Sequence, residues 1–225
     1  MQFIDQIENT SHPYVFMFHG FGADMHDLYS LADLMNPDHY HLNWVFPNGL
    51  HTVPIGPGWT GRAWWPLKLS SLPGDWSNYA PENFDQLIQT VMRFIESYKL
   101  PWDKIIFAGF SQGAMLATQL YLSAPETPLG LLSLSGSLIN SESWNKLLPH
   151  RKGEKIFLSH GEQDQVLPTK GTNRLVETFK KQGLQTDFVS FQGGHEIPPQ
   201  VCVRAKKYLT EILQQKKILK ANAIS

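Results

Sequence analysis

The most informative stretch of the chain for its fold is K-I-I-F-A-G-F-S-Q-G-A-M, residues 104–115. Residues 105–108 form a short apolar run, which is typical of a strand buried on both faces. The G-x-S-x-G pentapeptide 109–113 comes next, and good helix formers follow it over 114–120. This order of strand, sharp turn and helix predicts a strained backbone at Ser111, with its hydroxyl projecting above the sheet edge. Glycine at both ends of the pentapeptide fits, because side chains there would collide across the turn.

Further apolar runs alternate with helical patterns along the rest of the chain. Residues 50–79 interrupt this alternation, and their Gly, Pro and Trp content predicts a long irregular loop. Strands alternating with helices predict a mostly parallel sheet covered on both faces, an α/β fold in a single domain over residues 1–225. The strands are expected at 3–7, 14–18, 42–46, 105–108, 129–134, 155–159 and 186–191, and the helices at 25–34, from Pro81 to about 95, 114–123, 169–181 and 199–217.

Composition limits the classes of function. Lys and Arg number 19 against 20 Asp and Glu, so the net charge of -1 gives no reason to expect a nucleic-acid partner. The lone cysteine, Cys202, excludes an intramolecular disulfide, fits a reducing compartment and is most simply a buried small apolar residue. The first residues lack the pattern of a signal peptide, and no apolar run approaches the ~18 residues of a membrane span. We therefore expect a cytoplasmic protein without a transmembrane segment, and a homodimer is one state that the sequence allows.

Three residues after predicted strand ends form a candidate catalytic set. Reactive groups in an open parallel sheet gather at the carboxyl ends of the strands. A serine nucleophile needs an imidazole as base, and the imidazole needs a carboxylate that orients it. Ser111, Asp164 and His195 stand in the order that α/β-hydrolases use. Two glycines before His195 allow its loop to swing the ring inward.

Other residues compete for the roles of base and acid. His19 and His160 also follow strands, but they precede the turn, and we expect them to hydrogen-bond the loop backbone instead. Asp164 has an alternative role as an ordinary turn residue. Asp103 and Asp187 are less suitable acids, because they lie at the amino ends of predicted strands.

The reaction also needs hydrogen-bond donors for the oxyanion that develops on the substrate carbonyl. The backbone amide of Gln112, in the first turn of a helix, is one natural donor. The amide of Phe21, between Gly20 and Gly22 in the loop after an early strand, is the expected second donor. The sequence contains no metal-binding or phosphate-binding motif, so we expect neither a metal nor another cofactor.

Tryptophan is concentrated in one part of the chain. Trp59, Trp64, Trp65 and Trp76 fall within eighteen residues, inside the expected loop 50–79. They either pack beneath that loop or form an apolar wall for a substrate. The second reading predicts that Trp59, Trp64 and Trp65 contact the substrate.

Four motifs resemble those of the phospholipase/carboxylesterase family of small α/β-hydrolases, which includes bacterial carboxylesterases and acyl-protein thioesterases: H-G-F-G-A-D (19–24), G-F-S-Q-G (109–113), H-G-E-Q-D (160–164) and G-H (194–195). The similarity runs from about residue 14 to residue 213. It implies the α/β-hydrolase fold, a triad of Ser111, Asp164 and His195, and an oxyanion pair from the amides of Phe21 and Gln112. The segment R-A-W-W (62–65) resembles one that flanks the family's acyl channel, with Pro66 where an aspartate is usual.

These observations predict a serine carboxylesterase for esters or thioesters with short to medium acyl chains. A lysophospholipase or an acyl-protein thioesterase is the alternative within the hydrolases. A catalytically silent hydrolase fold that binds a small lipid is the alternative of another class. The complete set of serine, histidine, aspartate and oxyanion loop favours an enzyme acting on a small-molecule or lipid ester.

Overall fold

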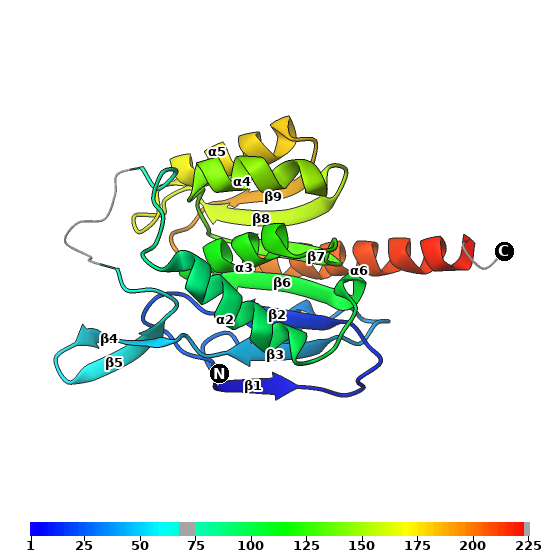
Figure 1. Cartoon of the computed structure of the whole chain (residues 1–225), viewed down its shortest axis with the longest axis horizontal. Coiled ribbons are helices and arrows are strands. Elements are labelled where there is room, and N and C mark those ends of the chain that lie inside the picture. The colour runs from blue at the N-terminus through cyan, green and yellow to red at the C-terminus, as the bar shows by residue number, and fades with distance from the viewer. Residues whose placement is uncertain (68–74, 223–225) are drawn as a thin grey trace.

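The computed structural model describes residues 1–67 and 75–222, with side chains up to residue 216 (Figure 1). Its centre is a seven-stranded sheet in the order β1-β3-β2-β6-β7-β8-β9. Only β1 runs antiparallel to its neighbour, and every other pair in this sheet is parallel. The strands are β1 (Phe3–Gln6), β2 (Tyr14–Phe18), β3 (Asn43–Pro47), β6 (Ile105–Phe110), β7 (Gly130–Leu134), β8 (Lys155–Gly161) and β9 (Gln185–Phe191). The predicted parallel sheet is confirmed.

The central strands are apolar along their whole length because helices cover both faces of the sheet. In β2, Phe16 and Phe18 pack into the core on one face, whereas Val15 and Met17 pack into the core on the other. The helices α2 (Phe84–Glu96), α3 (Gln112–Ser123), α4 (Ser141–Leu147) and α5 (Thr169–Lys181) lie on the first face. The helices α1 (Leu31–Met35) and α6 (Pro199–Asn222) lie on the second, and Cys202 of α6 is buried there as expected.

The expectation of an irregular loop over 50–79 is wrong for its first part. Strands β4 (His51–Gly56) and β5 (Trp59–Ala63) pair antiparallel in a hairpin that stands apart from the main sheet (Figure 1). Most of its side chains are exposed, so it lacks the apolar alternation that reveals a half-buried strand. Residues 68–74 of the expected loop lie outside the described residues.

Helices α1, α2 and α6 differ most from their predicted bounds, and α3 begins two residues early. The segment expected to be helical from Met25 forms successive turns, and regular helix covers only α1. Helix α2 begins after Asn83, whose left-handed backbone (φ 54°) breaks the helix that Pro81 was expected to open. Helix α6 continues five residues beyond its predicted end.

Candidate active site

Ser111 occupies the sharp turn between β6 and α3. Its φ of 56° and ψ of -119° lie outside the regions that L-residues prefer, as the motif predicts. The two flanking glycines make this turn feasible. A Cβ at Gly109 would lie 2.2 Å from the carbonyl oxygen of Gly113, and one at Gly113 would lie 2.1 Å from that of Phe18 in β2. The strained turn therefore depends on close backbone contacts within itself and with β2.

His195 connects Ser111 to Asp164. Its Nε2 lies 2.8 Å from Ser111 Oγ, and its Nδ1 lies 2.6 Å from Asp164 Oδ2. Because a carboxylate only accepts, Nδ1 carries the proton, and Nε2 is free to accept the serine hydroxyl proton. The His195 ring packs against Phe110, with ring centroids 4.7 Å apart. The structure thus brings together the three side chains that the sequence indicates.

Asp164 is completely buried at its side chain and receives donors at both oxygens. Its Oδ1 accepts from the amides of Val166 and Leu167, each at 2.8 Å. Burial by itself raises the pKa of this carboxyl. The hydrogen bonds from His160, His195 and the Leu167 amide outweigh burial and hold the pKa of Asp164 well below its usual range. The carboxylate therefore remains ionised beside His195.

The two residues whose amides are the expected oxyanion donors lie beside Ser111. Phe21 and Gln112 both line the same cavity as Ser111 and His195. Within the described parts of the chain, neither amide donates a hydrogen bond to a protein acceptor. The Gln112 amide also lies at the N-terminus of α3, where the helix dipole favours negative charge. The oxyanion pair of Phe21 and Gln112 therefore stays a prediction, with both residues placed at the cavity.

The β4–β5 hairpin holds the loop that carries Phe21. Gly22 donates to the carbonyl of Arg62 at 2.8 Å, and Arg62 donates to the carbonyl of Ala23 at 2.8 Å. A Cβ at Gly61 would lie 1.9 Å from the carbonyl oxygen of Gly22, so the two segments meet backbone to backbone. Gly22 itself has a φ of +84°, which favours glycine. The hairpin that sequence patterns missed is thus a structural support of the site.

A cavity of about 190 Å³ adjoins Ser111. Trp65 and Trp76 line it, in keeping with an aromatic wall. The other two tryptophans lie elsewhere, and here the sequence-based expectation is corrected. Trp64 is fully buried and donates its Nε1–H to the carbonyl of His19, whereas Trp59 is 73% exposed on the hairpin. The cavity wall is otherwise mainly apolar, with Phe21, Leu67, Phe110, Met115, Val166 and Leu167 among its members.

Comparison with known proteins identifies the family. The sequence profile described as Phospholipase/Carboxylesterase matches residues 1–213. The chain belongs to the phospholipase/carboxylesterase family. "Acyl-protein thioesterase 1 homolog 1" of Dictyostelium discoideum is 27% identical, with 92% of this chain and 94% of that protein covered. "Acyl-protein thioesterase 1" of Eremothecium gossypii is 28% identical, with coverage of 89% and 88%.

Solved structures confirm the α/β-hydrolase fold of this family member. The crystal structure of esterase PE8 superposes with a TM-score of 0.75 at 25% identity, covering 89% of this chain and 92% of that one. Acyl-protein thioesterase 2 of Zea mays gives a TM-score of 0.69 at 20% identity, covering 94% and 99%. Membership and these relatives together support a hydrolase of the esterase or thioesterase type.

The side chain of Gln112 has a second role that motif reasoning missed. Its Oε1 accepts from the Trp64 amide at 3.0 Å, and its Nε2 donates to the Trp65 carbonyl at 2.8 Å. The buried Gln112 side chain therefore hydrogen-bonds the backbone of Trp64 and Trp65 to the start of α3. A family motif names the residue type, but only the folded chain shows that residues 64 and 65 lie opposite it.

His19 and His160 bond the loop backbone, as the sequence predicts. His19 Nδ1 lies 2.7 Å from the Gly20 carbonyl, and its Nε2 accepts from the Gly49 amide at 2.9 Å. Burial lowers the pKa of His19, which fits a neutral ring that accepts at Nε2. His160 Nε2 lies 2.7 Å from the Leu167 carbonyl. Neither ring contacts Ser111 Oγ, so His195 is the base that the geometry favours.

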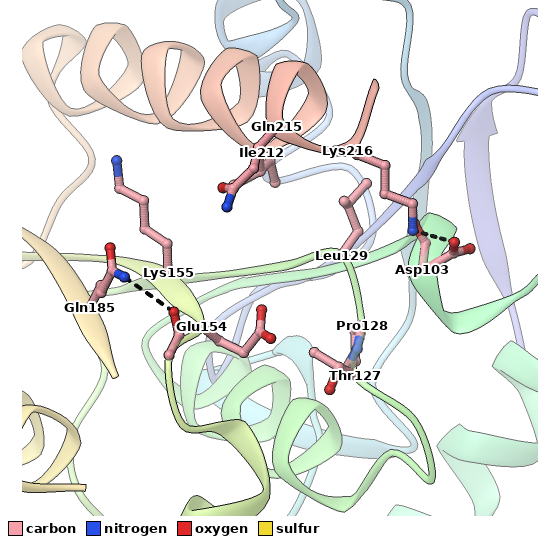
Figure 2. Close-up of a pocket in the computed structure, with 11 residues that line it drawn as sticks. Asp103, Thr127, Pro128, Leu129, Glu154, Lys155, Gln185, Ile212, Gln215 and Lys216 are labelled. Carbon is pink, nitrogen blue, oxygen red and sulfur yellow. Dashed lines mark hydrogen bonds and ion pairs between the residues drawn. The ribbon is translucent and has the colours of Figure 1, made fainter. Parts of the chain in front are cut away.

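A second hollow of about 260 Å³ lies at the amino ends of β6 to β9, opposite Ser111 (Figure 2). Charged residues line it, including Glu154, Lys155 and the ion pair of Asp103 with Lys216. Burial raises the pKa of Glu154, whose carboxyl points into the hollow. Its lining includes no serine, histidine or cysteine, so it lacks the pair of serine or cysteine nucleophile and imidazole base that lies at Ser111.

The described residues contain neither a group of metal ligands nor a membrane-spanning helix. Across 1–67 and 75–222, no three or more His, Cys, Asp or Glu side chains are grouped so that they could hold a metal ion. In the same ranges no helix is long and apolar enough to span a bilayer.

Proposed function

We propose that this family member is a serine carboxylesterase that acts through an acyl-enzyme. The observation that carries the proposal is the position of His195, hydrogen-bonded at 2.8 Å to Ser111 Oγ and at 2.6 Å to Asp164 Oδ2. A serine hydroxyl becomes an effective nucleophile when a base within this distance removes its proton. The carboxylate keeps the imidazole in the correct tautomer and stabilises the imidazolium that forms.

The proposed reaction has two halves. Ser111 Oγ attacks the ester carbonyl while His195 Nε2 takes the hydroxyl proton, and the oxyanion accepts from the amides of Phe21 and Gln112. His195 then gives this proton to the leaving alcohol or thiol, and the acyl group stays on Ser111. In the second half a water molecule loses a proton to His195 and attacks the acyl-enzyme. The carboxylic acid leaves, and Ser111 regains its proton.

The cavity favours short to medium acyl chains. Its volume of about 190 Å³ is somewhat above the ~150 Å³ of an apolar cavity that holds a benzene-sized molecule. An acyl group of about four to eight carbons has a comparable size. Trp65, Trp76 and Met115 supply the apolar contacts for such a chain. Flat activity of the purified protein across acetyl to lauroyl p-nitrophenyl esters would contradict this substrate preference.

A fluorophosphonate probe tests the chemistry apart from the substrate. We expect it to add one phosphonyl group to Ser111, detectable by peptide mass spectrometry, and to leave Ser111→Ala unmodified. A catalytically silent lipid-binding fold would show neither labelling nor ester hydrolysis. That result would overturn the proposed esterase and favour the binding function.

A thioesterase is the second candidate, because the Dictyostelium relative is named as an acyl-protein thioesterase homologue. This chain matches 94% of the length of that relative. The same triad cleaves esters and thioesters, so the site geometry does not separate them. Matched peptides carrying octanoyl on serine or on cysteine do so. A kcat/KM at least tenfold higher for the cysteine peptide would support the thioesterase, and the reverse order would support the carboxylesterase.

A further inference from the structure

His160 makes a contact that its expected role does not explain. It sits near the carboxyl end of β8 and is fully buried. Its Nε2 lies 2.7 Å from the Leu167 carbonyl and also 3.1 Å from Asp164 Oδ2. Asp164 Oδ2 therefore has two imidazoles beside it, because His195 approaches the same oxygen at 2.6 Å.

The partners of His160 determine which of its ring nitrogens donate hydrogen bonds. The Leu167 carbonyl and the Asp164 carboxylate only accept hydrogen bonds, so Nε2 must carry a proton. On the other side of the ring, Nδ1 lies 2.7 Å from the hydroxyl of Thr172 in α5. That hydroxyl donates its one proton to the Gly136 carbonyl, so its oxygen accepts from Nδ1–H of His160. Thr172 thus fixes the ring orientation in which Nε2–H bonds the Leu167 carbonyl and Nε2 lies 3.1 Å from Asp164 Oδ2.

The second imidazole changes what Asp164 offers to His195. Each hydrogen bond to a carboxylate disperses its negative charge and lowers its proton affinity. Two amide donors fix Oδ1 of Asp164, so loss of the His160 contact acts on Oδ2, the oxygen that faces His195. Loss of the His160 donor would then leave a more basic carboxylate against His195. The imidazolium of His195 would be stabilised, and the free base would form only at higher pH.

We propose that His160 is a positioning residue for the Ser111–His195–Asp164 triad, and that the hydrogen bond with Thr172 holds the His160 ring in place. His160 positions Asp164 Oδ2 and makes the Asp164 carboxylate less basic. The carboxylate then stabilises the imidazolium of His195 less strongly. The inference rests on the proposed function of Ser111, Asp164 and His195. His160 lines no part of the cavity beside Ser111, so its effect is expected in kcat and in the pH profile rather than in KM.

The wild type and the His160 variants share all other titratable groups near the triad. Glu196 follows His195, and its Oε1 accepts from the Gly194 amide. Glu162 accepts from the Ser190 hydroxyl, and Asp27 lines the cavity. Since these carboxylates are present in every variant, differences between the profiles report on His160 itself.

The test uses p-nitrophenyl butyrate and the full chain. His160→Gln keeps an N–H near the position of Nε2, and we expect its kcat to stay within about threefold of the wild type. His160→Leu removes the donor at similar volume. We expect its kcat to fall ~10- to 100-fold with an unchanged KM, the size of loss seen when a metal ligand loses its outer hydrogen-bond partner. The acid limb of its kcat/KM profile should move to higher pH by roughly half a unit.

A second pair of variants decides the matter if His160→Leu does not fold. Thr172→Val should shift the acid limb in the same direction, and Thr172→Ser should restore it. Thr118→Val is the matched control, because Thr118 is a buried helical threonine whose hydroxyl bonds the Ala114 carbonyl and Ser133 rather than a triad side chain. Identical acid limbs in wild type, the folded His160 variant and Thr172→Val would overturn the proposal. Wild-type activity in Ser111→Ala would instead refute the underlying esterase function.

Discussion

Replacement of Asp164 by asparagine tests the electrostatics of the site, because neither orientation of the amide satisfies its neighbours. Two backbone N–H groups approach Oδ1 at 2.8 Å each, and two imidazole N–H groups approach Oδ2 at 2.6 and 3.1 Å. An asparagine with its NH₂ toward the imidazoles places donors against donors. The flipped amide places the same NH₂ against the amides of Val166 and Leu167.

The expected loss of rate follows from the tautomer. With NH₂ toward His195, the imidazole turns its proton to Nε2 and can no longer accept from Ser111. Such a change at the aspartate of a serine protease lowers kcat by about 10⁴. We expect Asp164→Asn to lower kcat by ~10³–10⁴, and KM to change little because Asp164 does not line the cavity.

Steady-state hydrolysis of p-nitrophenyl butyrate measures this loss. Asp187→Asn is the control, because Asp187 is paired with Arg204 near the opposite end of the strands. It should retain kcat within about twofold, as expected for a paired aspartate outside the site. A kcat for folded Asp164→Asn within tenfold of the wild type would refute Asp164 as the carboxylate that orients His195.

Three further perturbations test the fold around the site. Gly113→Ala should destabilise the protein by ~3 kcal/mol or more in urea unfolding, since its Cβ would lie 2.1 Å from the Phe18 carbonyl; a neutral result would contradict the close contact. Arg151→Met should cost ~2–4 kcal/mol, because the buried guanidinium bonds three carbonyls at the end of α3. Arg174 is exposed and ion-paired, so Arg174→Met should lower the free energy of unfolding by at most ~1 kcal/mol. Equal losses of stability in the Arg151 and Arg174 variants would contradict the structural role of Arg151. The pKa of Asp164 is lower folded than unfolded, so its stabilisation is complete above about pH 5 and is lost as pH falls. The wild type should therefore lose more stability than Asp164→Asn between about pH 5 and pH 3, and parallel losses would contradict this.

The sequence predicts the central sheet well because its strands are buried on both faces. Residues 105–108 and 14–18 are apolar without interruption, and a run of this kind has few alternatives once a turn motif follows it. The triad could be predicted for the same reason, since the carboxyl ends of parallel strands meet at one edge of the sheet.

The parts that could not be predicted depend on contacts between distant segments. The β4–β5 hairpin is stabilised by backbone pairing with the loop at Gly22, which leaves no hydrophobic period to read. Trp64 and Trp65 are neighbours of the same type, yet one is enclosed in the core and the other lines the cavity. The hydrogen bonds of the Gln112 side chain with Trp64 and Trp65 also join residues far apart in the sequence, so no local pattern predicts them.

Catalysis as proposed requires Ser111, His195 and Asp164 to act as one unit. The most direct test compares kcat for Ser111→Ala with kcat for the triple variant Ser111→Ala/His195→Gln/Asp164→Asn. Groups that act only together are non-additive, so we expect the triple variant to lose no more than ~3-fold beyond the single one. A further loss of a hundredfold or more would show that His195 and Asp164 act independently of the serine and would contradict the claim.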